Sequence, residues 1–128
     1  MTITAMVTAA LAFVTDMDGT LVHYNETVEA RVADIVKLPV SSSGKMGLVS
    51  RTTLNLLDDV AAAGAVVVCA SGMRVATMRT RQPHFPAVQF WICENGGRIF
   101  ERTAEGTGLN ELLDWRRIGD DDKESEQA

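Results

Sequence analysis

Three short apolar runs, each followed by polar or turn-forming residues, constrain the fold of this 128-residue chain more than any other feature. The runs lie at Leu11–Thr15, Ala65–Cys69 and Val88–Cys93. A short, continuous apolar run of this kind is typical of a buried strand in a parallel sheet. Longer stretches with helical spacing separate the runs. The sequence therefore predicts an α/β fold, with a partial Rossmann-like parallel sheet of three strands and flanking helices.

Helix signals fill the first interval between these strands. Asn25 is a suitable N-cap for a helix that would end before Pro39. The apolar residues that would share one face of this helix are Val28, Val32, Ile35 and Val36. The Ser/Gly-rich segment Ser41–Gly47 then predicts a loop.

Two further helices are expected around the second strand. Ser50 is a suitable N-cap for the first of them, and Gly64 is placed to end it. The second would open at Ser71 and Gly72 and end before Pro83.

The C-terminal part of the chain is less regular. The stretch Arg98–Phe100 indicates the start of a hairpin, and Leu109–Ile118 is read as a short amphipathic helix. We therefore expect an α/β core over residues 1–100, the start of a cap or a short helix over 101–118, and a disordered acidic tail over 119–128.

Composition excludes several classes of protein. Residues 1–100 carry eight basic and eight acidic side chains, whereas residues 101–128 carry four and nine, so the net charge of −5 arises from the C-terminal segment. No basic stripe of the kind that binds nucleic acid is present, and no apolar stretch is long enough to cross a bilayer. Cys69 and Cys93 are best explained as buried thiols in a reducing, cytoplasmic compartment.

The sequence Asp16-Met17-Asp18-Gly19-Thr20 directly follows the first predicted strand. Residues two apart on an extended chain point the same way, so Asp16 and Asp18 can converge on one point. Their mutual repulsion predicts a bound cation, and oxygen ligands at a strand end suit Mg²⁺. Gly19 permits a sharp turn and Thr20 adds a hydroxyl donor. The alternative is an ordinary polar turn after a strand.

Two other polar segments follow the next two strands. Ser71 and Gly72 follow the second strand, and Asn95 follows the third. Ligands bind at the carboxyl ends of strands in open α/β sheets, so we expect these segments and Asp16 to share one rim. Ser71 could bind phosphate, or it could simply cap the next helix. Arg74 could reach an anion, or it could be a surface arginine.

These segments resemble the signatures of the haloacid dehalogenase-like (HAD) hydrolases. The run Asp16–Leu21 resembles the first signature of the family, and Ser71 after an apolar strand resembles the second. The segments Ala70–Arg74 and Glu94–Phe100 are similar to the Cof-type and sucrose-phosphatase-like branch. The resemblance covers roughly residues 11–100.

The resemblance implies a Mg²⁺-dependent phosphatase that acts on a small phosphorylated metabolite such as a sugar phosphate. Asp16 would be the nucleophile and Asp18 the general acid and base, with both contributing to the metal site. Substrate would be held by Thr20, Ser71, Gly72, Arg74 and Asn95.

Two later signatures of the family, a lysine and a distal acidic pair, have no convincing counterpart in the sequence. The acidic run Asp120–Asp122 follows no apolar strand. The enzyme is therefore expected to be an incomplete form, with its first strand left as an apolar edge. The alternative is a non-catalytic remnant that binds itself or a partner through that edge.

Overall fold

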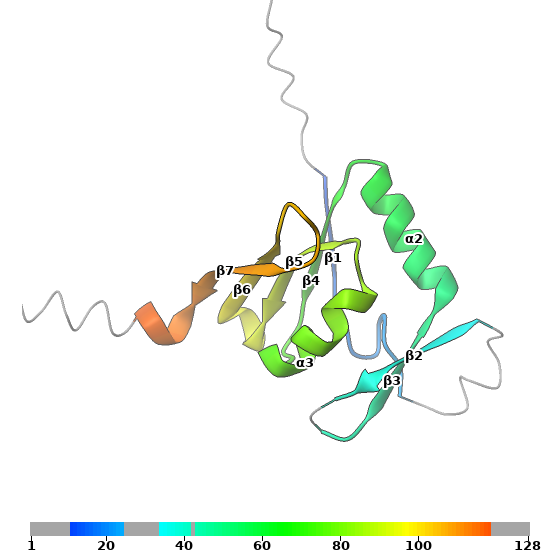
Figure 1. Ribbon diagram of the computed structural model, residues 1–128, viewed down its shortest axis with the longest axis horizontal. Coiled ribbons are helices and arrows are strands. Elements are labelled where there is room, and N and C mark those ends of the chain that lie inside the picture. The colour runs from blue at the N-terminus through cyan, green and yellow to red at the C-terminus, as the bar shows by residue number, and fades with distance from the viewer. Residues whose placement is uncertain (1–10, 25–33, 42, 119–128) are drawn as a thin grey trace, which may run out of the picture.

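A five-stranded mixed sheet forms the centre of the computed structural model, which describes residues 11–24, 34–41 and 43–118 (Figure 1). Its strands, in spatial order, are β1 (Ala12–Thr15), β4 (Val66–Ala70), β5 (Val88–Cys93), β6 (Arg98–Arg102) and β7 (Leu109–Asp114). The first three are parallel, and β6 and β7 continue the sheet in antiparallel fashion. The predicted α/β class is confirmed, but the sheet has five strands instead of the three predicted, and it is mixed instead of parallel.

Two helices lie between the parallel strands in the described part of the chain. Helix α2 spans Arg51–Ala62, and its N-terminus is capped as predicted, since the Ser50 hydroxyl accepts a hydrogen bond of 3.0 Å from the Thr53 N–H. Gly64 follows the helix with φ of +99°, a conformation that favours glycine. Helix α3 spans Val75–Arg81 and continues into a 3₁₀ turn at Gln82–His84.

The segment before α2 is a hairpin, which corrects the last part of the helix predicted up to Pro39; the first part of that helix, over residues 25–33, lies outside the described residues. Strands β2 (Ile35–Val40) and β3 (Met46–Ser50) pair in antiparallel fashion, apart from the main sheet (Figure 1). Pro39 lacks an N–H, and it is tolerated because the register shifts between Lys37 and Val40. The predicted loop therefore shrinks to a turn, and the proposed cap Asn25 lies outside the described residues.

The helix predicted over Leu109–Ile118 is also wrong for most of its length. Residues Leu109–Asp114 form β7, and only 115–118 are helical. Strand β7 is held by its pairing with β6, in which Leu113 lies opposite Ile99. The predicted hairpin at Arg98 is confirmed, because β6 pairs with β5. The acidic tail lies outside the described residues.

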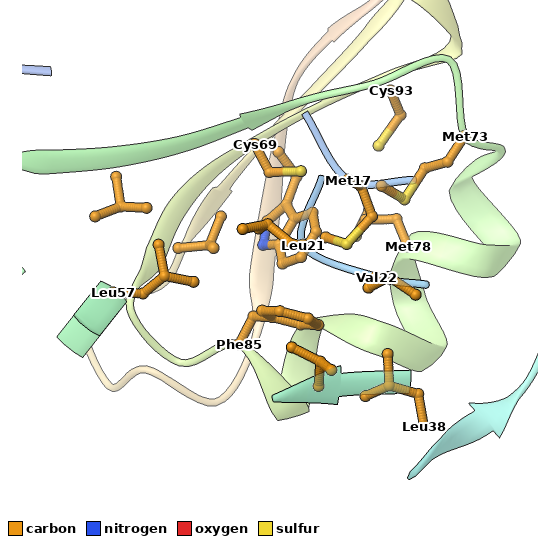
Figure 2. Packing of buried hydrophobic residues seen from close by; sticks show 14 of the residues in the cluster. Met17, Leu21, Val22, Leu38, Leu57, Cys69, Met73, Met78, Phe85 and Cys93 are labelled. Atoms are coloured by element: carbon orange, nitrogen blue, oxygen red, sulfur yellow. The ribbon is translucent and has the colours of Figure 1, made fainter. Parts of the chain in front are cut away.

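The turn after β1 supplies much of the core beneath the sheet. The N–H groups of Leu21 and Val22 both donate to the Met17 carbonyl, at 2.9 and 3.0 Å, and the side chains of all three are buried. Figure 2 shows them packed among Cys69 of β4, Met78 of α3 and neighbouring residues. This packing fixes the chain on either side of Asp18.

Strand β1 lies at one edge of the main sheet within the described residues. Its apolar side chains are poorly covered, with Phe13 42% and Val14 61% exposed. The predicted apolar edge is therefore present in the described part of the chain. Within that same part, no helix is long and apolar enough to cross a membrane.

Candidate active site

The carboxyl ends of the three parallel strands surround an open pocket of about 460 Å³. We call it the Asp16 pocket; its lining residues are Asp16, Ala70, Ser71, Gly72, Ile92, Asn95 and Gly96. Asp16 follows β1, Ser71 and Gly72 follow β4, and Asn95 follows β5. The structure therefore brings together four residues that the sequence predicts at one rim.

The Asp16 carboxylate is available to a ligand. Asp16 is exposed, and among the described residues its side chain forms no hydrogen bond and no ion pair. Its position is fixed through the main chain, since the Thr15 hydroxyl donates to the Asp16 carbonyl at 2.9 Å. An uncompensated carboxylate at a strand end is suited to act as a nucleophile or a metal ligand.

Ser71 does not cap a helix, contrary to one of its two predicted roles. Helix α3 begins at Val75 with Arg74 at the N-cap, and the Ser71 hydroxyl accepts a hydrogen bond of 3.2 Å from the Met73 N–H. The Ser71 N–H donates to the Ile92 carbonyl at 2.9 Å, which ties this segment to β5. The hydroxyl proton of Ser71 remains able to donate to an anion in the pocket.

The opposite wall of the pocket has an uncommon backbone. Glu94 and Asn95 have φ of +51° and +56°, a region that residues other than glycine seldom adopt. Two such residues in succession are typical of functional sites, where the surrounding structure holds the strain. Gly72 faces this turn closely, because a Cβ on it would lie 2.8 Å from Oδ1 of Asn95. Gly72 is thus needed for the observed position of the Asn95 side chain.

Asp18 lines a second pocket, of about 340 Å³. We call it the Asp18 pocket; its lining residues are Asp18, Tyr24, Ser41, Ser43, Gly72, Met73, Arg74, Thr77 and Arg81. Gly72 lines both pockets, so the two adjoin at that residue. Among the predicted substrate-binding residues, Arg74 belongs to this second pocket, and Thr20 is exposed outside both.

Two hydrogen bonds hold the Asp18 carboxylate. Its Oδ1 accepts from the Tyr24 hydroxyl at 2.7 Å and from Nη1 of Arg81 at 3.0 Å, and Arg81 also donates to the Tyr24 hydroxyl. Partial burial by itself would raise the pKa of Asp18. The hydrogen bonds from Tyr24 and Arg81 outweigh that effect and hold the pKa below its ordinary value of 3.8. Asp18 is therefore an ionised carboxylate at neutral pH.

Sequence reasoning missed Arg81 and Tyr24. Arg81 is only 1% exposed and lies on the buried side of α3 with Val75 and Met78, at intervals of three residues. An arginine on the apolar stripe of a helix indicates a carboxylate partner in the core. The sequence pattern could thus have predicted that Arg81 is paired, but not that Asp18 is its partner.

The donor set for a metal is small. The described residues contain no group of three or more His, Cys, Asp or Glu side chains that could hold an ion. Asp16 offers a free carboxylate, while Arg81 and Tyr24 already occupy one oxygen of Asp18. Mg²⁺ needs only one or two protein carboxylates when phosphate and water complete its coordination. The residues present therefore fit a weakly held Mg²⁺ with Asp16 as its principal protein ligand.

The sequence matches no protein-family model and no curated protein.

Proposed function

We propose that the chain is a HAD-like hydrolase that hydrolyses phosphomonoesters through a phosphorylated Asp16. One observation supports this proposal above the others: the free Asp16 carboxylate faces a pocket that it shares with Ser71, Gly72 and Asn95. The Ser71 hydroxyl and the Asn95 side-chain amide suit the non-bridging oxygens of a phosphoryl group.

The proposed reaction has two displacements at phosphorus. An Asp16 carboxylate oxygen attacks the phosphorus, the bond to the leaving oxygen breaks, and that oxygen takes a proton from Asp18. Water then attacks the phosphorus of the aspartyl phosphate and gives a proton to Asp18. The second displacement releases inorganic phosphate and regenerates the Asp16 carboxylate.

In the free protein, Asp18 is in the ionised form that the second displacement requires. Because Arg81 and Tyr24 keep Asp18 ionised in the free protein, it is ready to accept the proton of the attacking water. Its role as an acid in the first displacement requires that the negative substrate raise its pKa.

Mg²⁺, held by Asp16 and the main-chain carbonyl of Asp18, would shield the charge of the phosphoryl group when bound. Among the described residues, no lysine lines the Asp16 pocket to supplement that charge. Loss of one stabilising donor typically lowers a rate about a hundred- to a thousandfold, so we expect slow turnover.

The proposed substrate is a small phosphorylated metabolite, and the proposed location is the cytoplasm, which suits the two buried free thiols.

The test is phosphate release from a generic phosphomonoester with excess Mg²⁺. We expect slow turnover by the 128-residue chain and none by the Asp16→Asn variant, because an amide is a far weaker nucleophile. Asp58→Asn is the matched control, since Asp58 is an exposed aspartate on α2. Mass spectrometry of the acid-quenched enzyme should find a phosphoryl group on Asp16. Equal turnover by all three proteins would show that Asp16 is not the nucleophile.

A second candidate function is a non-catalytic binding module that associates through β1. The observation that favours it is the exposure of Phe13 and Val14 on the outermost described strand. Under this alternative, Phe13→Lys would abolish self- or partner association in sedimentation experiments, and Asp16→Asn would leave it unchanged.

A further inference from the structure

The Asp18 pocket has a lining that differs from that of the Asp16 pocket and suits a different part of a substrate. We propose that it binds the leaving group, and that this leaving group is a small hydroxylated molecule with a negative charge of its own. The inference rests on the proposed phosphatase function and specifies its substrate class.

The position of the pocket is the first argument. The two pockets meet at Gly72, with Asp16 lining one and Asp18 the other. A phosphoester with its phosphorus beside Asp16 therefore passes Gly72, which has no side chain, and enters the Asp18 pocket. The group that has to be protonated on departure would lie next to the carboxylate that is proposed to protonate it.

The charge of the lining is the second argument. Arg74 is exposed, and among the described residues its side chain has no hydrogen-bond or ion-pair partner. The charge of Arg81 is offset by Asp18, so Arg74 leaves the lining with a net positive charge. Lys45 lies nearby, with its Nζ 5.9 Å from the centre of the Tyr24 ring. An anion beside Arg74 would neutralise this excess, and a guanidinium is well suited to a carboxylate or phosphate.

The hydroxyl groups of the lining are the third argument. Ser41, Ser43, Thr77 and Tyr24 line the pocket, and Met73 is the one long apolar side chain among its described lining residues. Such a surface leaves an apolar leaving group without contacts and offers hydrogen bonds to a hydroxylated one. A volume of about 340 Å³ is near the lower end for small-molecule pockets, which favours a molecule of a few carbons.

The test compares two phosphoesters of the same length by calorimetry, with Mg²⁺ and at about 0.15 M salt to screen non-specific attraction. The first is 3-phosphoglycerate, and the second is glycerol 3-phosphate, in which a hydroxymethyl group replaces the carboxylate. We expect the intact chain to bind 3-phosphoglycerate about tenfold more tightly, as one charge-assisted contact provides.

Two arginine variants show which residue causes the difference in affinity between the two phosphoesters. Arg74→Gln should abolish the tenfold preference for 3-phosphoglycerate over glycerol 3-phosphate. Arg79→Gln is the control, because Arg79 is an exposed arginine of the same helix that lines neither pocket, and it should keep the preference. Circular dichroism should confirm that both variants fold.

The outcomes separate this inference from the proposed function. If inorganic phosphate binds but the two phosphoesters bind equally, or if both arginine variants lose the preference alike, the inference is wrong and the phosphatase proposal stands. If free glycerate binds in an Arg74-dependent manner but phosphate does not bind, the Asp18 pocket is a site for an anion and the phosphatase proposal is wrong. If none of the four compounds binds, both are wrong.

Discussion

Nη1 of Arg81 lies 3.0 Å from Oδ1 of Asp18, although 63 positions separate the two residues in the sequence. The contact joins the end of α3 to the turn after β1, and the Tyr24 hydroxyl bonds to both side chains. Asp18 is 53% exposed, whereas Arg81 is almost completely buried. The buried arginine therefore anchors a carboxylate that faces solvent, and the position of Asp18 depends on the docking of α3.

Substitution of Arg81 should destabilise the fold. Arg81→Gln removes the hydrogen bonds to Asp18 and Tyr24 and leaves a buried gap, so we expect a loss of about 1–3 kcal/mol in the free energy of unfolding. Urea denaturation measures this loss. Arg74→Gln, at an exposed position of the same segment, should change stability by less than about 0.5 kcal/mol. Equal stability of the two variants would show that the pair contributes nothing.

Arg102 should be less tolerant of substitution than Arg81. It is 7% exposed, and its guanidinium donates to the main-chain carbonyls of Val88, Gln82, Phe85 and Gly106 and to the Gln82 side chain, at 2.8–3.2 Å. An ammonium group cannot reach all of these acceptors, so Arg102→Lys should lose about 3 kcal/mol or more in urea denaturation. Arg117→Lys is the control, since that side chain is 82% exposed; a similar loss there would contradict the explanation.

Asp114 should make stability depend on pH in the acid range. Hydrogen bonds from Arg116 at 2.8 and 3.0 Å hold the pKa of Asp114 well below its ordinary value of 3.8. As the pH falls, the unfolded chain takes up the proton first. The stabilisation is therefore complete above about pH 4 and is lost as the pH falls further toward the lower pKa of the folded state.

Unfolding in urea between pH 2 and pH 7 measures this dependence. Asp114→Asn should be less stable at neutral pH and should lose less stability on acidification than the unsubstituted chain. Asp58→Asn, at an exposed position on α2, should follow the unsubstituted chain. Parallel curves for Asp114→Asn and the unsubstituted chain would rule out the proposed role of Arg116.

Gly72→Ala should displace Asn95 without unfolding the protein. The new methyl group would lie 2.8 Å from Oδ1 of Asn95, so the amide has to rotate or move. The change should appear as a shift of the Asn95 side-chain amide signals in NMR spectra, together with weaker phosphate binding. Gly108→Ala is the control, because its Cβ would approach Thr103 no closer than 3.4 Å. An unshifted Asn95 amide would show that the contact relaxes elsewhere.

The parallel part of the fold could be predicted because its signals are local. Continuous apolar runs mark β1, β4 and β5, and the hydroxyl of Ser50 and the positive φ of Gly64 bound α2. The shared rim follows from the strand order, since parallel strands place their carboxyl ends together.

The β2/β3 and β6/β7 hairpins could not be predicted from periodicity alone. Ile35 and Val36 fit a helical spacing, yet they pair with Ser50 and Val49 in β2 and β3. The same holds for Leu113, which pairs with Ile99. In both hairpins the pairing with another strand decided the structure. The β-branched residues of β2 and the turn at Gly106 between β6 and β7 could nevertheless have indicated strands.

Some residues of the candidate site could likewise be located from the sequence, whereas the contacts of others could not. Asp16, Ser71 and Asn95 could be located because each follows a strand. The anchoring of Asp18 by Arg81 and Tyr24 could not, because it depends on where α3 packs. The strained backbone of Glu94 was equally hidden, since glutamate seldom adopts a positive φ.

The edge position of β1 has a consequence for how the site loses its structure. Among the described strands, β1 pairs on one side only, with β4, and Asp16 directly follows it. Such a strand can detach while the remaining strands stay paired, so the amides of β1 should exchange with solvent faster than those of β4 and β5. The proposed nucleophile would then be lost in a local opening rather than in global unfolding. Any molecule that pairs with the free side of β1 would slow that opening and stabilise the site without touching Asp16.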